Sequence, residues 1–187
     1  MLHIKRNIVN VLFALVAALS FTMMTGTPAH AATITVTATT NWSALTGGSG
    51  PGGLPNSADT VTVGNAATLT VDVTNAVVGT LNLGIGSGGS NGNGTLSFSA
   101  GTSDLYVATS LVIGASAKTG SISMSSGGTL SLGGTVTNTM PGTWTVGTGA
   151  VSYNGTVQTV DATFFTSYYN LTLAGSGAKT LPVGLTT

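Results

Sequence analysis

The chain of 187 residues is almost uncharged, since only 4% of its residues are Asp, Glu, Lys or Arg and its formal net charge is zero. Cysteine is absent, and beyond residue 31 there is no Arg, Glu or His, so the acids, bases, nucleophiles and soft metal ligands of most active sites are scarce. This composition argues against an enzyme, a metal or cofactor site, and a nucleic-acid-binding protein, which needs clustered Lys and Arg.

The first 31 residues have the features of a cleaved secretion signal. Two basic residues precede an apolar run over residues 8–24, and Ala29 and Ala31 supply the small side chains that a signal peptidase requires. We expect cleavage after Ala31, which predicts a secreted or cell-surface protein whose mature part, residues 32–187, has no membrane span. A retained anchor is the weaker interpretation, because the apolar run is short for a helix that crosses a bilayer in about 20 residues.

The mature part is rich in Gly and Thr, and its short alternations of apolar and small polar residues predict β-strands with one buried face. Apolar residues at helical spacing do not persist over a window, and strong helix formers other than Ala and Leu are few, so we expect an all-β fold. In chain order the clearest predicted strands are 60–63, 69–73, 81–83, 96–98, 122–124, 130–132, 144–146, 151–153 and 171–173.

Two architectures fit many short strands separated by turns: a parallel β-solenoid of stacked coils and a β-sandwich, in which Asn-Gly dipeptides would make hairpin turns. A weak repeat favours the solenoid. A small residue, Leu, a small polar residue, and Leu or Phe recur from positions 80, 95, 129 and 170. The first two copies start 15 residues apart, and the later gaps of 34 and 41 would each span about two coils of roughly 20 residues.

Several segments share recognisable motifs, namely Asn-Trp-Ser, a Gly/Pro loop, a strand of the form D-x-V-x-V and a strand T-L-T-V. They are residues 41–43, 47–55, 59–63 and 67–72, with a second group at 149–159 and 168–173. In these segments the chain resembles bacterial exported β-helical surface proteins of the filamentous-haemagglutinin adhesin type. The resemblance implies a right-handed parallel β-helix at the cell surface, and it supplies no catalytic residues.

We therefore expect an exported, non-catalytic structural or adhesin-like solenoid that takes part in adhesion or in surface-layer or matrix assembly. Its polar faces would bind glycans or a host or matrix surface, and its ends could associate with other copies. The last predicted coil, residues 178–183, lacks a polar capping element, which solenoids need. This indicates that residues 32–187 are the N-terminal part of a longer protein.

Two other functions stay open. A secreted carbohydrate-binding module would stack aromatic rings on sugars. Tyr168 and Tyr169 are the candidates for this contact, because adjacent strand residues point in opposite directions and one of them should face solvent. Alternation instead assigns Trp144 and Tyr153 to the core, and Trp42 is expected to plug the N-terminal end. An ice-binding solenoid would need regular Thr pairs, whereas the Thr-x-Thr pairs of this chain recur at uneven intervals.

The four acidic residues of the mature part, Asp59, Asp72, Asp104 and Asp161, are scattered along the sequence. They lack the dense spacing of a calcium-binding repeat, and for an acid–base pair acting on a sugar the mature part contains only two Lys residues that could neutralise an acidic substrate. We expect these carboxylates to cap turns and to aid solubility.

Overall fold

The computed structural model describes residues 30–85, 92–183 and 185, and residues 31–187 form one compact unit. Ala29, half of the predicted cleavage motif, lies outside the described residues, whereas Ala31 is described and exposed. Two short 3-10 helices are present, η1 (Trp42–Ala44) and η2 (Pro51–Gly53). The strands are β1 (Thr33–Val36), β2 (Thr40–Asn41), β3 (Thr60–Val63), β4 (Ala67–Val71), β5 (Ala76–Leu83), β6 (Gly94–Phe98), β7 (Asp104–Ile113), β8 (Gly120–Ser123), β9 (Thr129–Leu132), β10 (Thr135–Asn138), β11 (Pro141–Thr145), β12 (Ala150–Tyr153), β13 (Gln158–Thr159), β14 (Asn170–Leu173) and β15 (Lys179–Thr180).

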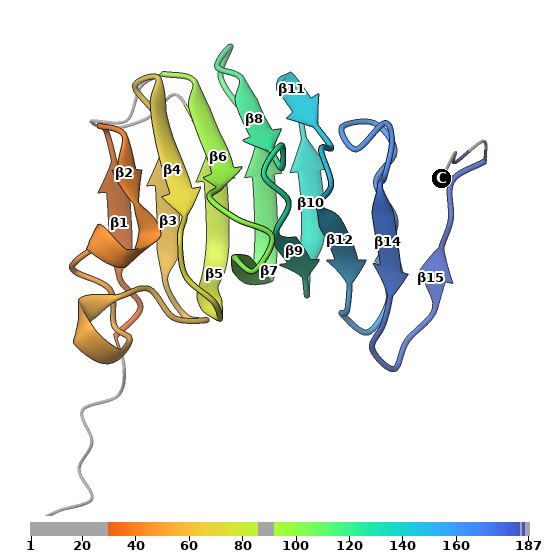
Figure 1. Cartoon of the computed structure of the whole chain (residues 1–187), viewed down its shortest axis with the longest axis horizontal. Coiled ribbons are helices and arrows are strands. Elements are labelled where there is room, and N and C mark those ends of the chain that lie inside the picture. Colours follow the sequence, from red (N-terminus) through yellow and green to blue (C-terminus); the bar gives the residue numbers. More distant parts are fainter. Residues whose placement is uncertain (1–29, 86–91, 184, 186–187) are drawn as a thin grey trace, which may run out of the picture. The chain divides into compact units, whose positions relative to one another are not determined.

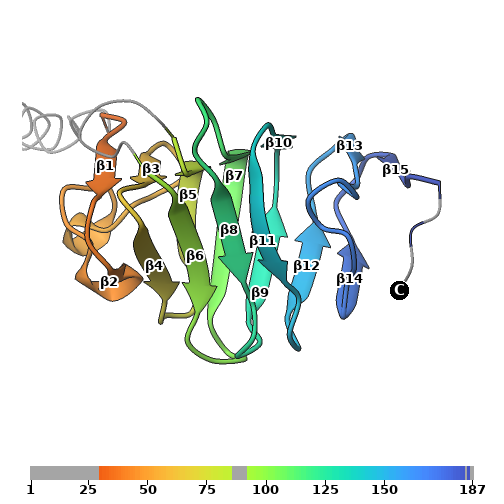
Figure 2. The same ribbon diagram turned by 90° about the horizontal axis from the view of Figure 1, so that it is seen from above.

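These strands form two main parallel sheets (Figures 1 and 2). The long sheet has the order β1-β3-β5-β7-β9-β12-β14, with β10 also paired to β7, and the short sheet has the order β11-β8-β6-β4-β2. A separate parallel pair joins β13 to β15. Each coil contributes a strand to a sheet and pairs with the equivalent strand of the next coil, so the chain winds into a β-solenoid of about 6 turns. The named strands of both sheets pair in parallel, which excludes the sandwich, whose sheets are antiparallel.

The coils differ in length, which explains why the sequence repeat is irregular. On the long sheet Val61 pairs with Leu81, which is 20 residues later, while Leu81 pairs with Leu111, which is 30 residues later. The repeat copies at 80 and 95 lie on β5 and β6, which belong to opposite sheets. The copies at 129 and 170 lie two coils apart on the long sheet, as predicted, but the gap of 34 joins the short sheet to the long one.

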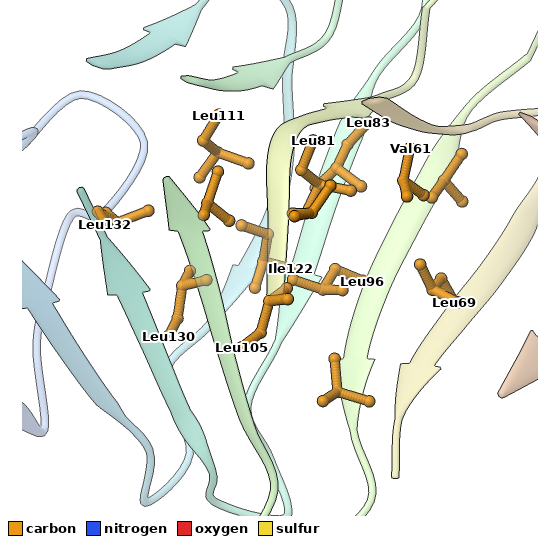
Figure 3. Close-up of a cluster of buried hydrophobic side chains, with 14 of the residues drawn as sticks. Val61, Leu69, Leu81, Leu83, Leu96, Leu105, Leu111, Ile122, Leu130 and Leu132 are labelled. Carbon is orange, nitrogen blue, oxygen red and sulfur yellow. The ribbon is translucent and has the colours of Figure 1, made fainter. Parts of the chain in front are cut away.

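The core lies between the two sheets, where the inward residues of neighbouring coils stack. In β3 the burial pattern alternates strictly, with Val61 and Val63 buried and the two Thr residues half-buried. The residues that Figure 3 labels come from both sheets and are almost completely buried. Such ladders supply most of the stability of a chain without disulfides, at roughly 25 cal/mol per Å² of apolar surface removed from water.

All nine predicted segments overlap observed strands, and β7 is the longest strand that the alternation did not predict. Its inward positions are apolar at both ends, but Thr109 in the middle is exposed, so the alternation of buried and exposed residues is interrupted there. The paired strand β5 has a register shift at the same level, around Gly79. A Cβ atom at Gly79 would come within 2.6 Å of the Ser57 carbonyl oxygen, so this bend requires glycine.

An aromatic cluster connects β11 with the segment that precedes β14. Trp144 packs on Phe164 and Phe165 with ring centroids 6.1 and 4.8 Å away, and Phe165 contacts Tyr168 at 6.0 Å. The Trp144 indole N–H donates to the Ser167 carbonyl oxygen over 2.8 Å. The segment around Phe164 and Phe165 therefore packs against the last strand of the short sheet, and it contains no strand of its own.

Candidate functional site

The outward face of the long sheet carries two columns of aligned side chains, and all but one of these side chains are polar. Strand pairing aligns one outward residue from each of β1, β3, β5, β7 and β10 in one column and the residue two positions later in a parallel column. We call these ten residues the long-sheet hydroxyl face. The first column is Thr33, Thr60, Thr80, Ser110 and Thr135, and the second is Thr35, Thr62, Asn82, Val112 and Thr137.

The fold sets the spacing of this face. Neighbouring strands of a sheet lie about 4.8 Å apart, and alternate residues of a strand lie about 6.6 Å apart, so the columns form a nearly rectangular array. Within it the Asn82 amide donates to Thr62 Oγ1 over 3.2 Å, and the Thr135 hydroxyl donates to Ser110 Oγ over 3.4 Å. Val112 is the apolar member of the face. The array therefore presents a rigid pattern of hydroxyl donors and acceptors.

Three of the Thr-x-Thr pairs seen in the sequence, at 33/35, 60/62 and 135/137, belong to this face. Their uneven intervals in the sequence do not prevent alignment across the sheet, because the coils between them differ in length by the same amounts. Sequence reasoning missed the intervening members on β5 and β7, where Asn82, Ser110 and Val112 replace Thr. Only the pairing of the strands identifies these residues as one surface.

The short sheet has a second polar face with more Ser than the first. One of its two columns has three members and the other has five, and a register shift interrupts the pairing of β11 with β8. The Thr70 and Ser97 hydroxyls hydrogen-bond to each other over 2.9 Å, which leaves less of their capacity for an outside partner. The aligned residues are Thr68, Thr95 and Ser121 in one column and Asn41, Thr70, Ser97, Ser123 and Thr145 in the other.

The acidic residues do not meet in a common site. Asp72 accepts two hydrogen bonds from Ser43, of 2.9 Å from its backbone N–H and 2.5 Å from its hydroxyl; burial opposes ionisation, but these bonds lower the pKa of Asp72 overall. Asp104 accepts from the Asn75 N–H and Asp161 from the backbone of residues 163–165. Within the described ranges no three His, Cys, Asp or Glu side chains lie close enough to hold a metal ion. Capping of the chain at corners is the observed role of these carboxylates.

The two tyrosines considered for sugar stacking have different environments. Tyr168 is 6% exposed, and its hydroxyl hydrogen-bonds to the Tyr153 hydroxyl over 3.0 Å and donates to the Asp161 carbonyl oxygen. Burial raises the pKa of Tyr153 to about 12 and also raises that of Tyr168. Tyr169 is 62% exposed, so of the two residues it is the one whose ring can reach an external ligand.

A hollow of about 490 Å³ lies between η2 and the turn that joins β4 to β5. Trp42, Leu54 and Val73 are among its mainly apolar lining residues, and Trp42 itself is buried in the first coil. The lining contains no titratable side chain. The hollow therefore has the size of a small-molecule site but offers no group for acid–base chemistry.

No protein-family model, curated protein or solved structure matches the chain. The resemblance to exported adhesins therefore depends on the sequence motifs alone. No helix in the described part of the chain is long and apolar enough to cross a membrane.

Proposed function

We propose that this chain is an exported, non-catalytic β-solenoid that acts at the cell surface in adhesion or in surface-layer or matrix assembly. It would contact a repetitive surface, such as a glycan, through its long-sheet hydroxyl face. The observation that carries the proposal is the alignment of polar side chains over β1, β3, β5, β7 and β10. The leader supports export, and the near absence of catalytic side chains beyond residue 31 supports a structural role.

Binding through such a face depends on the number of hydrogen bonds and on the rigidity of the sheet that presents them. One hydrogen bond contributes a net free energy of only about 1 kcal/mol, but many bonds formed by a preorganised sheet act together. Several copies on one cell would add avidity. Because the face contains no charged side chain, we expect its binding to change little between low and physiological salt, unlike binding that depends on ion pairs.

The test uses the labelled mature protein and a panel of insoluble polysaccharides and matrix-coated surfaces. The variant Thr60→Lys/Thr80→Lys places two charged chains in the middle of the long-sheet hydroxyl face, and Thr95→Lys/Ser121→Lys is the matched control on the short sheet. We expect retention on at least one surface, with a loss of about tenfold or more in the first variant only. Equal retention of both variants, with circular dichroism unchanged, would contradict the proposed binding face.

Ice binding is the second candidate, and the register of the same columns favours it, because a flat hydroxyl array with fixed repeats can order water into a lattice. The same two variants distinguish it from adhesion. Inhibition of ice recrystallisation by the mature protein, lost on Thr60→Lys/Thr80→Lys, would support this function. Growth of ice crystals at the rate seen with an inert protein would exclude it.

Self-association through the ends forms part of the proposal. The strands β1 and β14 stand at the two ends of the main strand order of the long sheet, and edge strands can pair with another chain. Leu173 on β14 is 44% exposed, and Leu181 and Val183 nearby are 51% and 106% exposed. Head-to-tail stacking would cover these side chains, and sedimentation of the mature protein over a range of concentrations would detect it; a monomer at all concentrations would exclude it.

A further inference from the structure

The Asp59 side chain is completely buried just before β3 begins, and four hydrogen bonds from described residues hold its carboxylate. The backbone N–H of Ala32 donates to Oδ1 over 2.7 Å, and the Ser49 hydroxyl donates to the same oxygen over 2.6 Å. The backbone N–H groups of Ser49 and Asn56 donate to Oδ2 over 2.8 and 2.9 Å. The side chain therefore ties together the start of β1, the loop before η2 and the turn before β3.

In the part of the chain that the structure describes, the donors to this carboxylate are all neutral groups. Burial alone would raise the pKa of Asp59, but the bonds from Ser49, Ala32 and Asn56 lower it to about 2, so the group is ionised at neutral pH. A buried carboxylate of this kind normally has a cationic partner as well. Within the described ranges no Lys side chain donates a hydrogen bond to it, and the hydrogen bonds of Lys179 go to backbone carbonyls at the other end of the unit.

Among these donors the Ala32 nitrogen is the one that can become cationic, because Ala32 follows the predicted cleavage point. Hydrolysis by a signal peptidase breaks the C–N bond between Ala31 and Ala32. Water supplies the hydroxyl that completes the Ala31 carboxyl group and the hydrogen that goes to the Ala32 nitrogen. The new α-amine takes up a further proton at neutral pH, since the pKa of a free α-amino group is about 8.

We propose that the α-ammonium of Ala32, released by cleavage after Ala31, forms an ion pair with the buried carboxylate of Asp59 and fastens the first strand to the solenoid. The nitrogen already lies within hydrogen-bond distance of Oδ1, so the pair needs no rearrangement of the chain. The carbonyl oxygen of Ala32 accepts a hydrogen bond from the Thr60 N–H over 2.8 Å, which fixes the same residue to β3. This inference rests on the leader cleavage of the proposed function and does not depend on adhesion.

The ion pair gives the mature protein a pH dependence with a defined sign. An ammonium that pairs in the folded state has a higher pKa there than in the unfolded chain, so its stabilisation is full below about pH 8 and is lost as the pH rises through the folded value. Asp59 is the charged group facing the amine, Ser49 and Asn56 do not titrate, and His30 leaves with the leader. A chain whose α-amine is blocked by acetylation should show no such loss.

The first test uses the full chain produced in a bacterial host that exports proteins. N-terminal sequencing of the exported product is expected to begin at Ala32. The mature protein then has three amines, Ala32, Lys118 and Lys179, which mass spectrometry distinguishes after brief acetylation. We expect the Ala32 amine of the folded protein to react at least tenfold more slowly than in the denatured protein, which corresponds to a pKa raised by about one unit.

Two variants separate the ion pair from a general effect of folding. Asp59→Asn keeps the size of the side chain and should restore rapid acetylation of Ala32, while Asp72→Asn removes another hydrogen-bonded carboxylate that contacts Ser43 and should leave Ala32 protected. If Asp59→Asn fails to fold, an NMR titration of the α-amine in the unaltered protein decides the matter. An ordinary α-amine pKa, or a first residue other than Ala32, would overturn the inference. Export and surface binding with either result would leave the proposed function standing.

Discussion

The substitution Leu81→Ala tests the claim that the stability of the chain comes mainly from the inward apolar side chains that stack between neighbouring coils. Leu81 is fully buried on β5, between Val61 of the preceding coil and Leu111 of the next. The substitution removes three carbon atoms, which at about 0.8 kcal/mol each corresponds to roughly 2.4 kcal/mol of lost transfer free energy. The cavity left between paired coils adds to this, so we expect a loss of about 3 kcal/mol in the free energy of unfolding.

Chemical denaturation of the mature protein, followed by circular dichroism, measures this loss. Asn82→Ala on the same strand is the control, because Asn82 faces outward and its amide makes one hydrogen bond, to Thr62. It should cost within about 1 kcal/mol, the usual net value of one such bond. A loss below about 1 kcal/mol for Leu81→Ala would refute the reasoning, since a continuous core cannot lose a central side chain at so little cost.

Three further substitutions address local features. Asp59→Asn should remove an acid-dependent part of the stability. The pKa of Asp59 is lowered to about 2, so the stabilisation by its carboxylate is present above the unfolded pKa of about 3.9 and is lost as the pH falls toward 2. Denaturation between pH 2 and 6 measures this loss. Gly84→Ala should destabilise the chain by more than about 1 kcal/mol in thermal unfolding, because φ is +66° and the new Cβ would lie 2.0 Å from the Thr119 carbonyl oxygen; an unchanged midpoint would contradict this corner geometry. Tyr168→Phe should lower stability by about 1–3 kcal/mol, while Tyr169→Ala should leave it unchanged and reduce glycan retention only if the exposed ring binds sugar.

Local alternation made most of the strands predictable, because each short strand buries every second side chain. The sequence of β3 predicts its bounds completely, since Thr and Val alternate over the whole strand. In β7 the exposed Thr109 interrupts the pattern, and the strand was not predicted. The packing of Phe164 and Phe165 was not predicted either, because these adjacent residues are both buried in a segment without strand periodicity.

The interactions that join distant residues could not be predicted from local patterns. The role of Asp59 as a turn cap was expected, and its bond from Asn56 fits that role, but its bonds from Ala32 and Ser49 come from residues 27 and 10 positions away. The long-sheet hydroxyl face could not be predicted from local patterns either, because its members are distant in the sequence and align only through the pairing of strands from coils of unequal length. Spacing along a sequence depends on the lengths of strands and turns, whereas alignment across a sheet depends on strand pairing.

Coils of unequal length and a regularly aligned outward face occur together in this chain, which indicates where insertions are tolerated. Extra residues in a coil lengthen the turns between strands, and a longer turn costs little free energy because loop entropy grows slowly with length. A change of one residue within a strand, in contrast, would exchange the inward Val and Leu side chains with the outward Thr side chains. The alternation of β3 therefore fixes two features together: the ladder that stabilises the solenoid and the outward array on which we base its function.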